Sequence, residues 1–77
     1  MGSTQRTIRV KLTVPESIAQ RPVMTQLPDK FNVSTNMLRA RFSDKGGWLE
    51  FQLTGAPTNI AKALAFLENE GVAVKKL

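Results

Sequence analysis

The stretch TIRVKLTV, residues 7–14, decides how the rest of the sequence is interpreted. Apolar and polar residues alternate along it, and the apolar positions are Ile8, Val10, Leu12 and Val14. Successive side chains of an extended chain point to opposite faces, so this alternation indicates a strand with one buried face. The solvent face would carry Arg9, Lys11 and Thr13. Pro15 follows, and it ends the strand because proline has no N–H to donate to a ladder.

Two further strands flank a loop at residues 43–47. The first, 34–42, is predicted to have an apolar face formed by Leu38, Ala40 and Phe42, with an opposite face formed by Met37, Arg39 and Arg41. The second, 48–54, is predicted to place Leu49, Phe51 and Leu53 inward and Trp48, Glu50 and Gln52 outward. The loop reads SDKGG, and its glycines can adopt the positive φ of a tight turn. These features predict an antiparallel hairpin.

A first helical pattern follows the first strand. Its apolar positions are Val23, Met24, Leu27 and Phe31, and Pro22 suits a first helical position. Pro28 conflicts with a long helix, because an interior proline costs about 3 kcal/mol. We therefore expect a kink, an early end near Leu27 or a late start, and a stop at Asn32.

A second helical pattern follows the hairpin. Thr58 is a suitable N-cap, and Gly71 is a suitable residue just past the end. The apolar stripe between them consists of Ile60, Ala63, Leu64 and Leu67. A short last strand is predicted from Val72.

The resulting order is strand, helix, strand, strand, helix, strand. Two helices must cover the single apolar face of a four-stranded antiparallel sheet, and right-handed crossovers leave few other arrangements. The sequence therefore predicts an α+β protein, the ferredoxin-like βαββαβ sandwich with both helices on one face. We expect one domain over residues 6–77, preceded by a flexible tail at 1–5.

Composition excludes several kinds of chemistry. The 77 residues include no cysteine and no histidine, so a Ser-His-Asp triad, a thiolate metal site and a cysteine nucleophile are all impossible within this chain. The six carboxylates are scattered, so we expect no catalytic site, no metal and no cofactor. No apolar run approaches the ~20 residues of a membrane span. We expect a cytoplasmic, non-enzymatic protein that does not insert into a membrane.

Several short segments resemble the NIL domain family. They are Pro22-Val23-Met24, Leu27, Phe31-Asn32-Val33, Asn36-Met37-Leu38, residues 49–55, residues 63–67 and Gly71-Val72. The family is named for an Asn-Ile-Leu tripeptide at the start of the second strand, where this chain has Met37 in the middle. The resemblance covers residues 7–77 and implies a small free-standing member, similar to the ACT-like C-terminal regulatory domain of methionine-uptake ABC transporter ATPases. Those domains bind methionine at a domain–domain interface, and others are fused to ferredoxins. This chain has neither a P-loop nor cysteines, so it corresponds to the bare domain.

The resemblance implies a ligand site at Asn36, Met37 and Leu38. The Asn36 amide can hold the carboxylate or the amine of an amino acid, although an asparagine at a strand start also bonds its own backbone. Met37 is an adaptable contact for a ligand or a partner subunit, or else core filler, because a register slip of one residue reverses every face. The leading hypothesis is a regulatory domain that binds an amino-acid-like ligand, with methionine as the first candidate, at a homodimer interface.

Two alternatives stay open. The first is an adaptor that docks on a larger protein. The second is a nucleic-acid binder, because the net charge is +5 and one sheet face would gather an aromatic with basic residues, namely Arg9, Lys11, Arg39, Arg41, Trp48 and Lys75. The glycine- and aromatic-rich signature of RNA-recognition modules is absent, so nucleic acid ranks below the other two partners. The same basic face would otherwise remain solvated or form a dimer.

Overall fold

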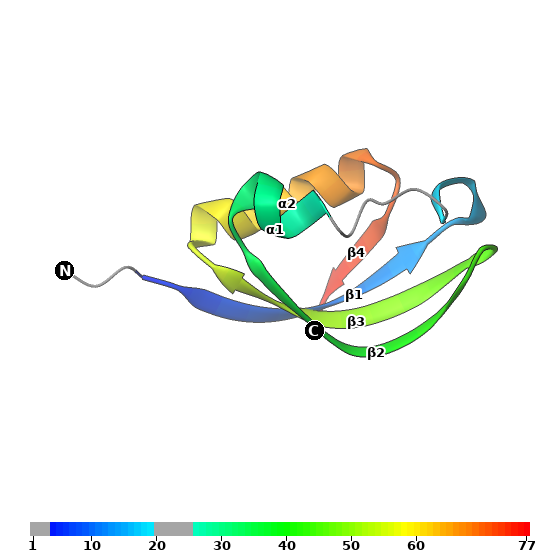
Figure 1. The fold of residues 1–77 in the computed structure, drawn as a ribbon, viewed down its shortest axis with the longest axis horizontal. Coiled ribbons are helices and arrows are strands. Elements are labelled where there is room, and N and C mark those ends of the chain that lie inside the picture. Colours follow the sequence, from blue (N-terminus) through cyan, green and yellow to red (C-terminus); the bar gives the residue numbers. More distant parts are fainter. Residues whose placement is uncertain (1–3, 20–25) are drawn as a thin grey trace.

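Four strands form one antiparallel sheet, with two helices on one of its faces (Figure 1). This computed structural model describes residues 4–19 and 26–77. The elements are β1 (Arg6–Val14), a one-turn 3₁₀ helix η1 (Glu16–Ile18), α1 (Leu27–Phe31), β2 (Ser34–Ser43), β3 (Gly46–Gly55), α2 (Pro57–Asn69) and β4 (Ala73–Lys76). The strand order is β2-β3-β1-β4. The predicted ferredoxin-like α+β fold is confirmed.

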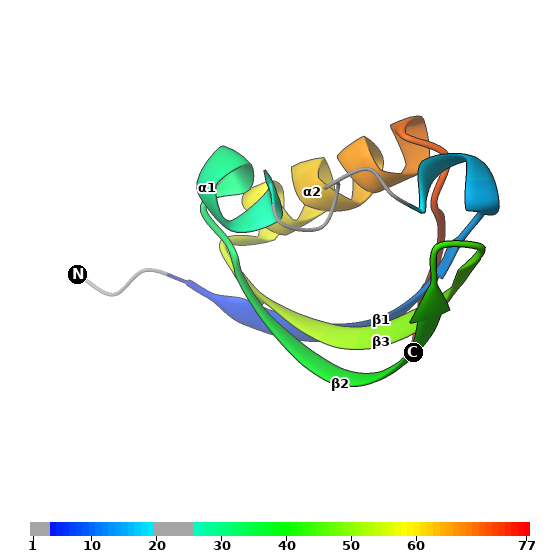
Figure 2. The same cartoon turned by 45° about the vertical axis from the view of Figure 1, so that its right-hand side comes forward.

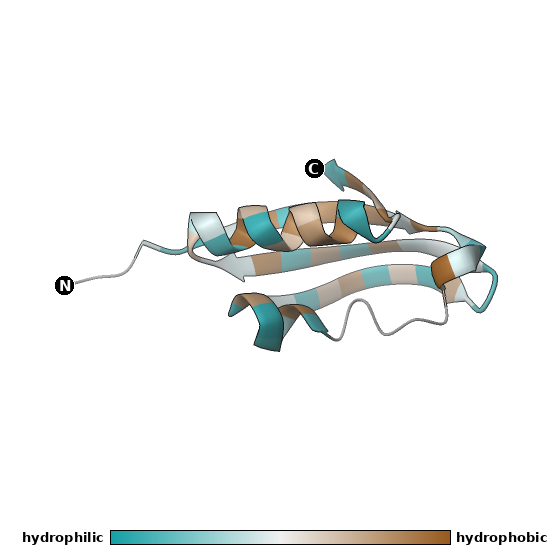
Figure 3. Cartoon of the chain, turned by 90° about the horizontal axis from the view of Figure 1, so that it is seen from above, coloured by the Kyte–Doolittle hydropathy of each residue, from teal (hydrophilic) through white to brown (hydrophobic). Residues whose placement is uncertain are grey.

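The core lies between α2 and the two central strands. In β1 and β3, Val10 pairs with Phe51 and Leu12 pairs with Leu49, and all four side chains are buried. The residues between these buried positions are mostly polar, and the colours alternate accordingly along the strands (Figure 3). The stripe of α2 closes this core with Ile60, Ala63, Leu64 and Leu67, which are all buried. The alternation in residues 7–14 and 48–54 is therefore confirmed.

The described part of α1 resolves the conflict around Pro28. The helix begins at Leu27, so Pro28 lies in its first turn, where a proline loses no intrahelical bond. This is the late start that the sequence allowed. Asn32 has φ 53° and adopts the left-handed conformation, which confirms the predicted stop. The predictions for Pro22, Val23 and Met24 lie outside the described residues.

α2 differs from prediction at its start and agrees at its end. Its N-cap is Ala56 and Pro57 takes the first turn, so Thr58 is inside the helix and its prediction as the cap is wrong. At the other end, Gly71 has φ +100° and donates its N–H to Glu68, while Val72 donates to Leu67 over 3.0 Å. These two bonds are the Schellman arrangement, which satisfies the last carbonyls of the helix.

The sheet curves around the helices and leaves its convex face uncovered (Figures 1 and 2). We call this convex side the open face. The free edges of the sheet are β2, with ten residues, and β4, with four. Residues 4 and 5 of the predicted tail have no regular structure, and residues 1–3 lie outside the described part of the chain. Within the described ranges, no helix is long and apolar enough to cross a membrane.

Candidate functional site

Asn36 lies on the open face of the sheet, and the side chain of Met37, the next residue in the chain, lies on the opposite face. It pairs with Gln52 across β2 and β3, and Asn36 Nδ2 donates a hydrogen bond to Gln52 Oε1 over 3.3 Å. The neighbours of Gln52 in the chain, Phe51 and Leu53, point into the core, so both amides point away from it. The Asn36 amide is exposed, and within the described part of the chain its carbonyl oxygen accepts no hydrogen bond, so it can accept one from a ligand.

A β-bulge at Leu38 changes the predicted faces of β2. Met37 pairs with Phe51, and Arg39 pairs with Glu50, so Leu38 is an extra residue without a partner across the ladder. An inserted residue reverses the alternation that follows it. Met37 therefore lies on the helix side of the sheet, so its predicted place on the opposite face is wrong, whereas Arg39 and Arg41 lie on that opposite face as predicted.

The prediction that β2 buries an apolar face is also wrong. All ten residues of β2 are exposed, because it is an edge strand and α1 is too short to cover its length. Met37 is 60% exposed, Phe42 is 45% exposed and Leu38 is 38% exposed. Among the described residues, β2 thus presents a ladder edge without a partner strand, and it carries three large exposed apolar side chains, Met37, Leu38 and Phe42.

The six predicted residues of the basic face are brought together on the open face. In β1 and β4 the face carries Arg9, Lys11 and Lys75, with Lys11 directly opposite Lys75. In β2 and β3 it carries Arg39, Arg41 and Trp48, with Arg41 directly opposite Trp48. Lys11 Nζ lies 4.9 Å from the centroid of the Trp48 ring, and Arg39 Nε lies 3.5 Å from Glu50 Oε1.

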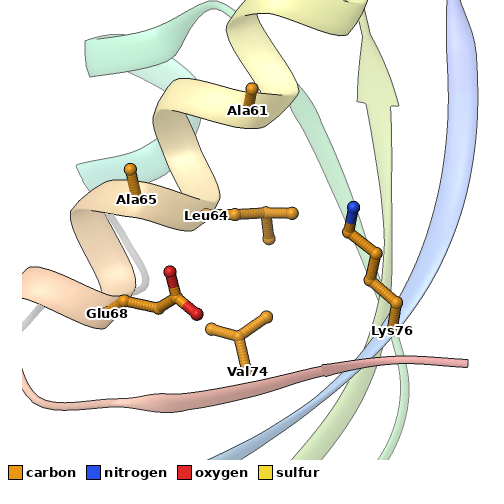
Figure 4. A pocket seen from close by; sticks show the side chains of 6 residues that line it. All are labelled: Ala61, Leu64, Ala65, Glu68, Val74 and Lys76. Carbon is orange, nitrogen blue, oxygen red and sulfur yellow. The ribbon is translucent and has the colours of Figure 1, made fainter.

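A shallow pocket of about 310 Å³ lies between α2 and β4, on the helix side of the sheet (Figure 4). Its apolar lining comes from Ala61, Leu64, Ala65 and Val74. Glu68 and Lys76 stand at its two ends, with no ion pair between them among the described residues (Figure 4). Sequence reasoning missed this pocket, because its two walls come from segments that no motif links. Among the described residues, no group of three or more carboxylates could hold a metal ion.

Comparisons with known proteins agree with this fold. The family model described as the NIL domain matches residues 8–76. An uncharacterized protein of Synechocystis sp. is 41% identical over 76 residues, covering 94% of this chain and 78% of that protein. An uncharacterized protein of Synechococcus elongatus is 29% identical over 69 residues, covering 86% of this chain and 85% of that protein.

A solved structure also resembles this chain. It is the C-terminal domain of an ABC transporter ATP-binding protein from Enterococcus faecalis. The TM-score is 0.80, the identity is 20%, and the match covers 91% of this chain and 82% of the other. At that identity the likeness shows the shared fold alone.

Proposed function

Because the chain belongs to the NIL domain family, we propose that it is a non-catalytic regulatory domain that binds a small amino-acid-like ligand at an interface between two copies of itself. Methionine is the first candidate for the ligand. The interface is assigned to β2, and the ligand contacts are assigned to Asn36, Met37 and Leu38.

The observation that carries this proposal is the exposure of β2. Its outer ladder edge has no partner strand within residues 4–19 and 26–77, and on the helix side of the strand Met37 is mostly exposed and Phe42 is about half exposed. A second copy could add its own β2 antiparallel to this edge. The main-chain N–H and C=O groups of the two strands would then form hydrogen bonds, and the exposed apolar side chains of the two copies would cover one another. Such a contact is symmetric, and twofold dimers are the commonest closed assemblies.

The three ligand residues need two chains to form one site. Asn36 and Met37 point to opposite faces of the same strand, so a single β2 cannot close around a small molecule with both side chains. Two antiparallel β2 strands side by side would place the two Asn36 amides together on the open face and the two Met37 side chains together on the helix side. A carboxylate or ammonium group of the ligand would meet the Asn36 amides of both copies, whereas an apolar group would meet the Met37 side chains on the other side of the junction, next to the bulge at Leu38.

Regulation then follows from linkage. A ligand that contacts residues of both copies binds the dimer more tightly than the monomer, so it shifts the population toward the dimer by its difference in affinity. The same ligand stabilises the folded state by RT ln(1 + [L]/Kd), which is about 2.7 kcal/mol at a hundredfold excess over Kd.

The test is calorimetric titration of amino acids into the wild-type protein and into Asn36→Ala. We expect Asn36→Ala to weaken binding about tenfold, because one charge-assisted hydrogen bond contributes on the order of 1.5 kcal/mol. Asn69→Ala is the matched control, since this exposed asparagine lies at the end of α2 and away from β2. Equal affinity in wild type and Asn36→Ala would remove Asn36 from the site. If no amino acid raises the melting temperature of the wild-type protein, the proposal that the domain binds an amino-acid-like ligand is wrong.

A further inference from the structure

The charge of the molecule is concentrated on the open face of the sheet. This face carries five basic side chains, from Arg9, Lys11, Arg39, Arg41 and Lys75, and among its described residues one acidic side chain, from Glu50. Its net charge is therefore +4, and the rest of the chain carries the remaining +1 of a total of +5. A face of one sign attracts anionic partners and repels a second copy of itself.

The acidic side chain does little to neutralise this face. Glu50 has a side chain that is only 17% exposed, and it lies beside Arg39, which is 70% exposed above it. Within the described part of the chain, Arg9, Arg41 and Lys75 have no ion pair. These three side chains can therefore bind an external anion without first breaking an ion pair within the described part of the chain.

The spacing of the basic groups matches a ligand that carries several negative charges along an extended chain. Arg39, Lys11 and Lys75 follow one line across the sheet through Glu50, so they span three strand spacings, or about 14 Å. Arg41 and Arg9 stand two residues along their strands from this line, at about 7 Å. A small anion would occupy one of these positions, whereas a flexible polyanion can follow all of them.

Uncharged groups at the centre indicate which polyanion fits. Trp48 is half-buried and lies between Arg41 and Thr13, with the Lys11 ammonium over its ring. The paired amides of Asn36 and Gln52 lie on the same face. An aromatic surface with surrounding cations is the recurring platform for unstacked bases, and exposed amides can reach base edges. The convex sheet offers neither a helix nor a two-stranded ribbon to the groove of a duplex.

We propose that the open face binds single-stranded nucleic acid, with phosphates on the five basic residues and a base against Trp48, where it would displace the Lys11 ammonium from the ring toward a phosphate. The binding surface shares the Asn36 amide with the proposed ligand site, but its five cations and Trp48 take no part in that site, so the proposal does not rest on the proposed ligand. Side-by-side pairing of two β2 strands would leave the open face of both copies accessible. The twofold axis of such an antiparallel pair is perpendicular to the sheet, so the two open faces lie on the same side of one continuous sheet.

Trp48 supplies the assay, because it is the only tryptophan in the chain. We expect its fluorescence to be quenched when a single-stranded oligothymidine of about 20 nucleotides is titrated at low salt, since a stacked base contacts the ring. With four to five phosphate contacts, the logarithm of the binding constant should fall against the logarithm of salt concentration with a slope of roughly −3.

Two matched double variants assign the binding to the face. Arg41→Gln with Lys75→Gln removes two cations from the open face, and it should reduce the slope by roughly 1.4, at 0.7 per cation. Lys62→Gln with Lys76→Gln removes the same charge from α2 and from the helix side of β4, and it should leave the slope unchanged. Lys75 and Lys76 are neighbours in the chain on opposite faces of the sheet, so their comparison controls for position.

Three results would overturn the proposal. One is the absence of quenching at low salt, where phosphate contacts are strongest. Another is an equal loss of affinity in both double variants, which would mean diffuse attraction to net charge. The third is polyglutamate binding as tightly as the oligonucleotide with the same quenching, which would assign the face to an acidic protein. Circular dichroism of each variant confirms that the fold is intact.

Discussion

Replacing Phe42 by serine separates a role at a dimer interface from a role in the monomer core. In the single chain Phe42 is 45% exposed on β2, so much of its ring contacts solvent. If β2 pairs with β2 of a second copy, that exposed area becomes buried twice, once in each subunit. Phe42→Ser should therefore weaken association, in addition to removing the folding stability that the covered part of the ring contributes.

The magnitude follows from the exposed area. A phenylalanine side chain buries about 200 Å², so 45% exposure leaves roughly 90 Å² to be covered. At about 25 cal/mol per Å² this is roughly 2 kcal/mol for each subunit and roughly 4 kcal/mol for a symmetric dimer. Because each 1.4 kcal/mol is a factor of ten, the dissociation constant of the dimer should rise by up to about 10³-fold.

Sedimentation equilibrium over a range of concentrations measures this change. Leu77→Ser is the matched control, since Leu77 is a 58% exposed apolar residue that lies beyond β4 and away from β2. The control should leave the dissociation constant unchanged. Phe42→Ser should also lower the melting temperature, because about half of the ring is covered in the single chain, so circular dichroism is used to confirm that both variants are folded. The reasoning is refuted if Phe42→Ser and wild type associate equally, or if the wild-type chain stays monomeric at all concentrations.

Three further predictions concern stability, each measured by urea unfolding. Leu53→Ala should lower the free energy of unfolding by about 2–5 kcal/mol because Leu53 is fully buried in β3, whereas Leu38→Ala, at the exposed bulge, should lower it by about 1 kcal/mol or less. Similar losses in the two variants would contradict the assigned burial. Gly71→Ala should cost about 1–2 kcal/mol, since φ +100° is unfavourable for a residue with a Cβ, and an unchanged midpoint would argue against the Schellman end of α2. Gly47→Ala should cost more than Gly71→Ala, because its Cβ would collide with the Arg41 carbonyl oxygen, and the reverse order would contradict the hairpin geometry.

The sequence was sufficient for the elements that follow a strict period. Residues 7–14 and 48–54 alternate without interruption, and their apolar positions lie on the core side as predicted, although Ile8 is only partly buried there. The left-handed Asn32 and Gly71 also ended their helices as predicted, because few residue types tolerate positive φ. Local chemistry determines these features, so local sequence reveals them.

Features that depend on distant residues were not predictable. The bulge at Leu38 exists because β2 must pair with β3 on both sides of one extra residue, and nothing in the order of residues 34–43 marks it. The exposure of β2 depends on how little of it α1 covers, which is a matter of tertiary packing. The six residues of the basic face nevertheless lie on one face, as predicted. Arg39 and Arg41 both follow the bulge and are two residues apart, so the bulge does not separate them.

The two free edges of the sheet differ in length, and the difference limits how far association can proceed. A head-to-tail contact would place β4 of one copy along β2 of the next, and it would repeat without end. The four residues of β4 can pair with less than half of the ten residues of β2, and Lys75 and Lys76 are of the type that blocks edge pairing in natural sheets. The domain can therefore expose a long strand at high concentration without polymerising into filaments.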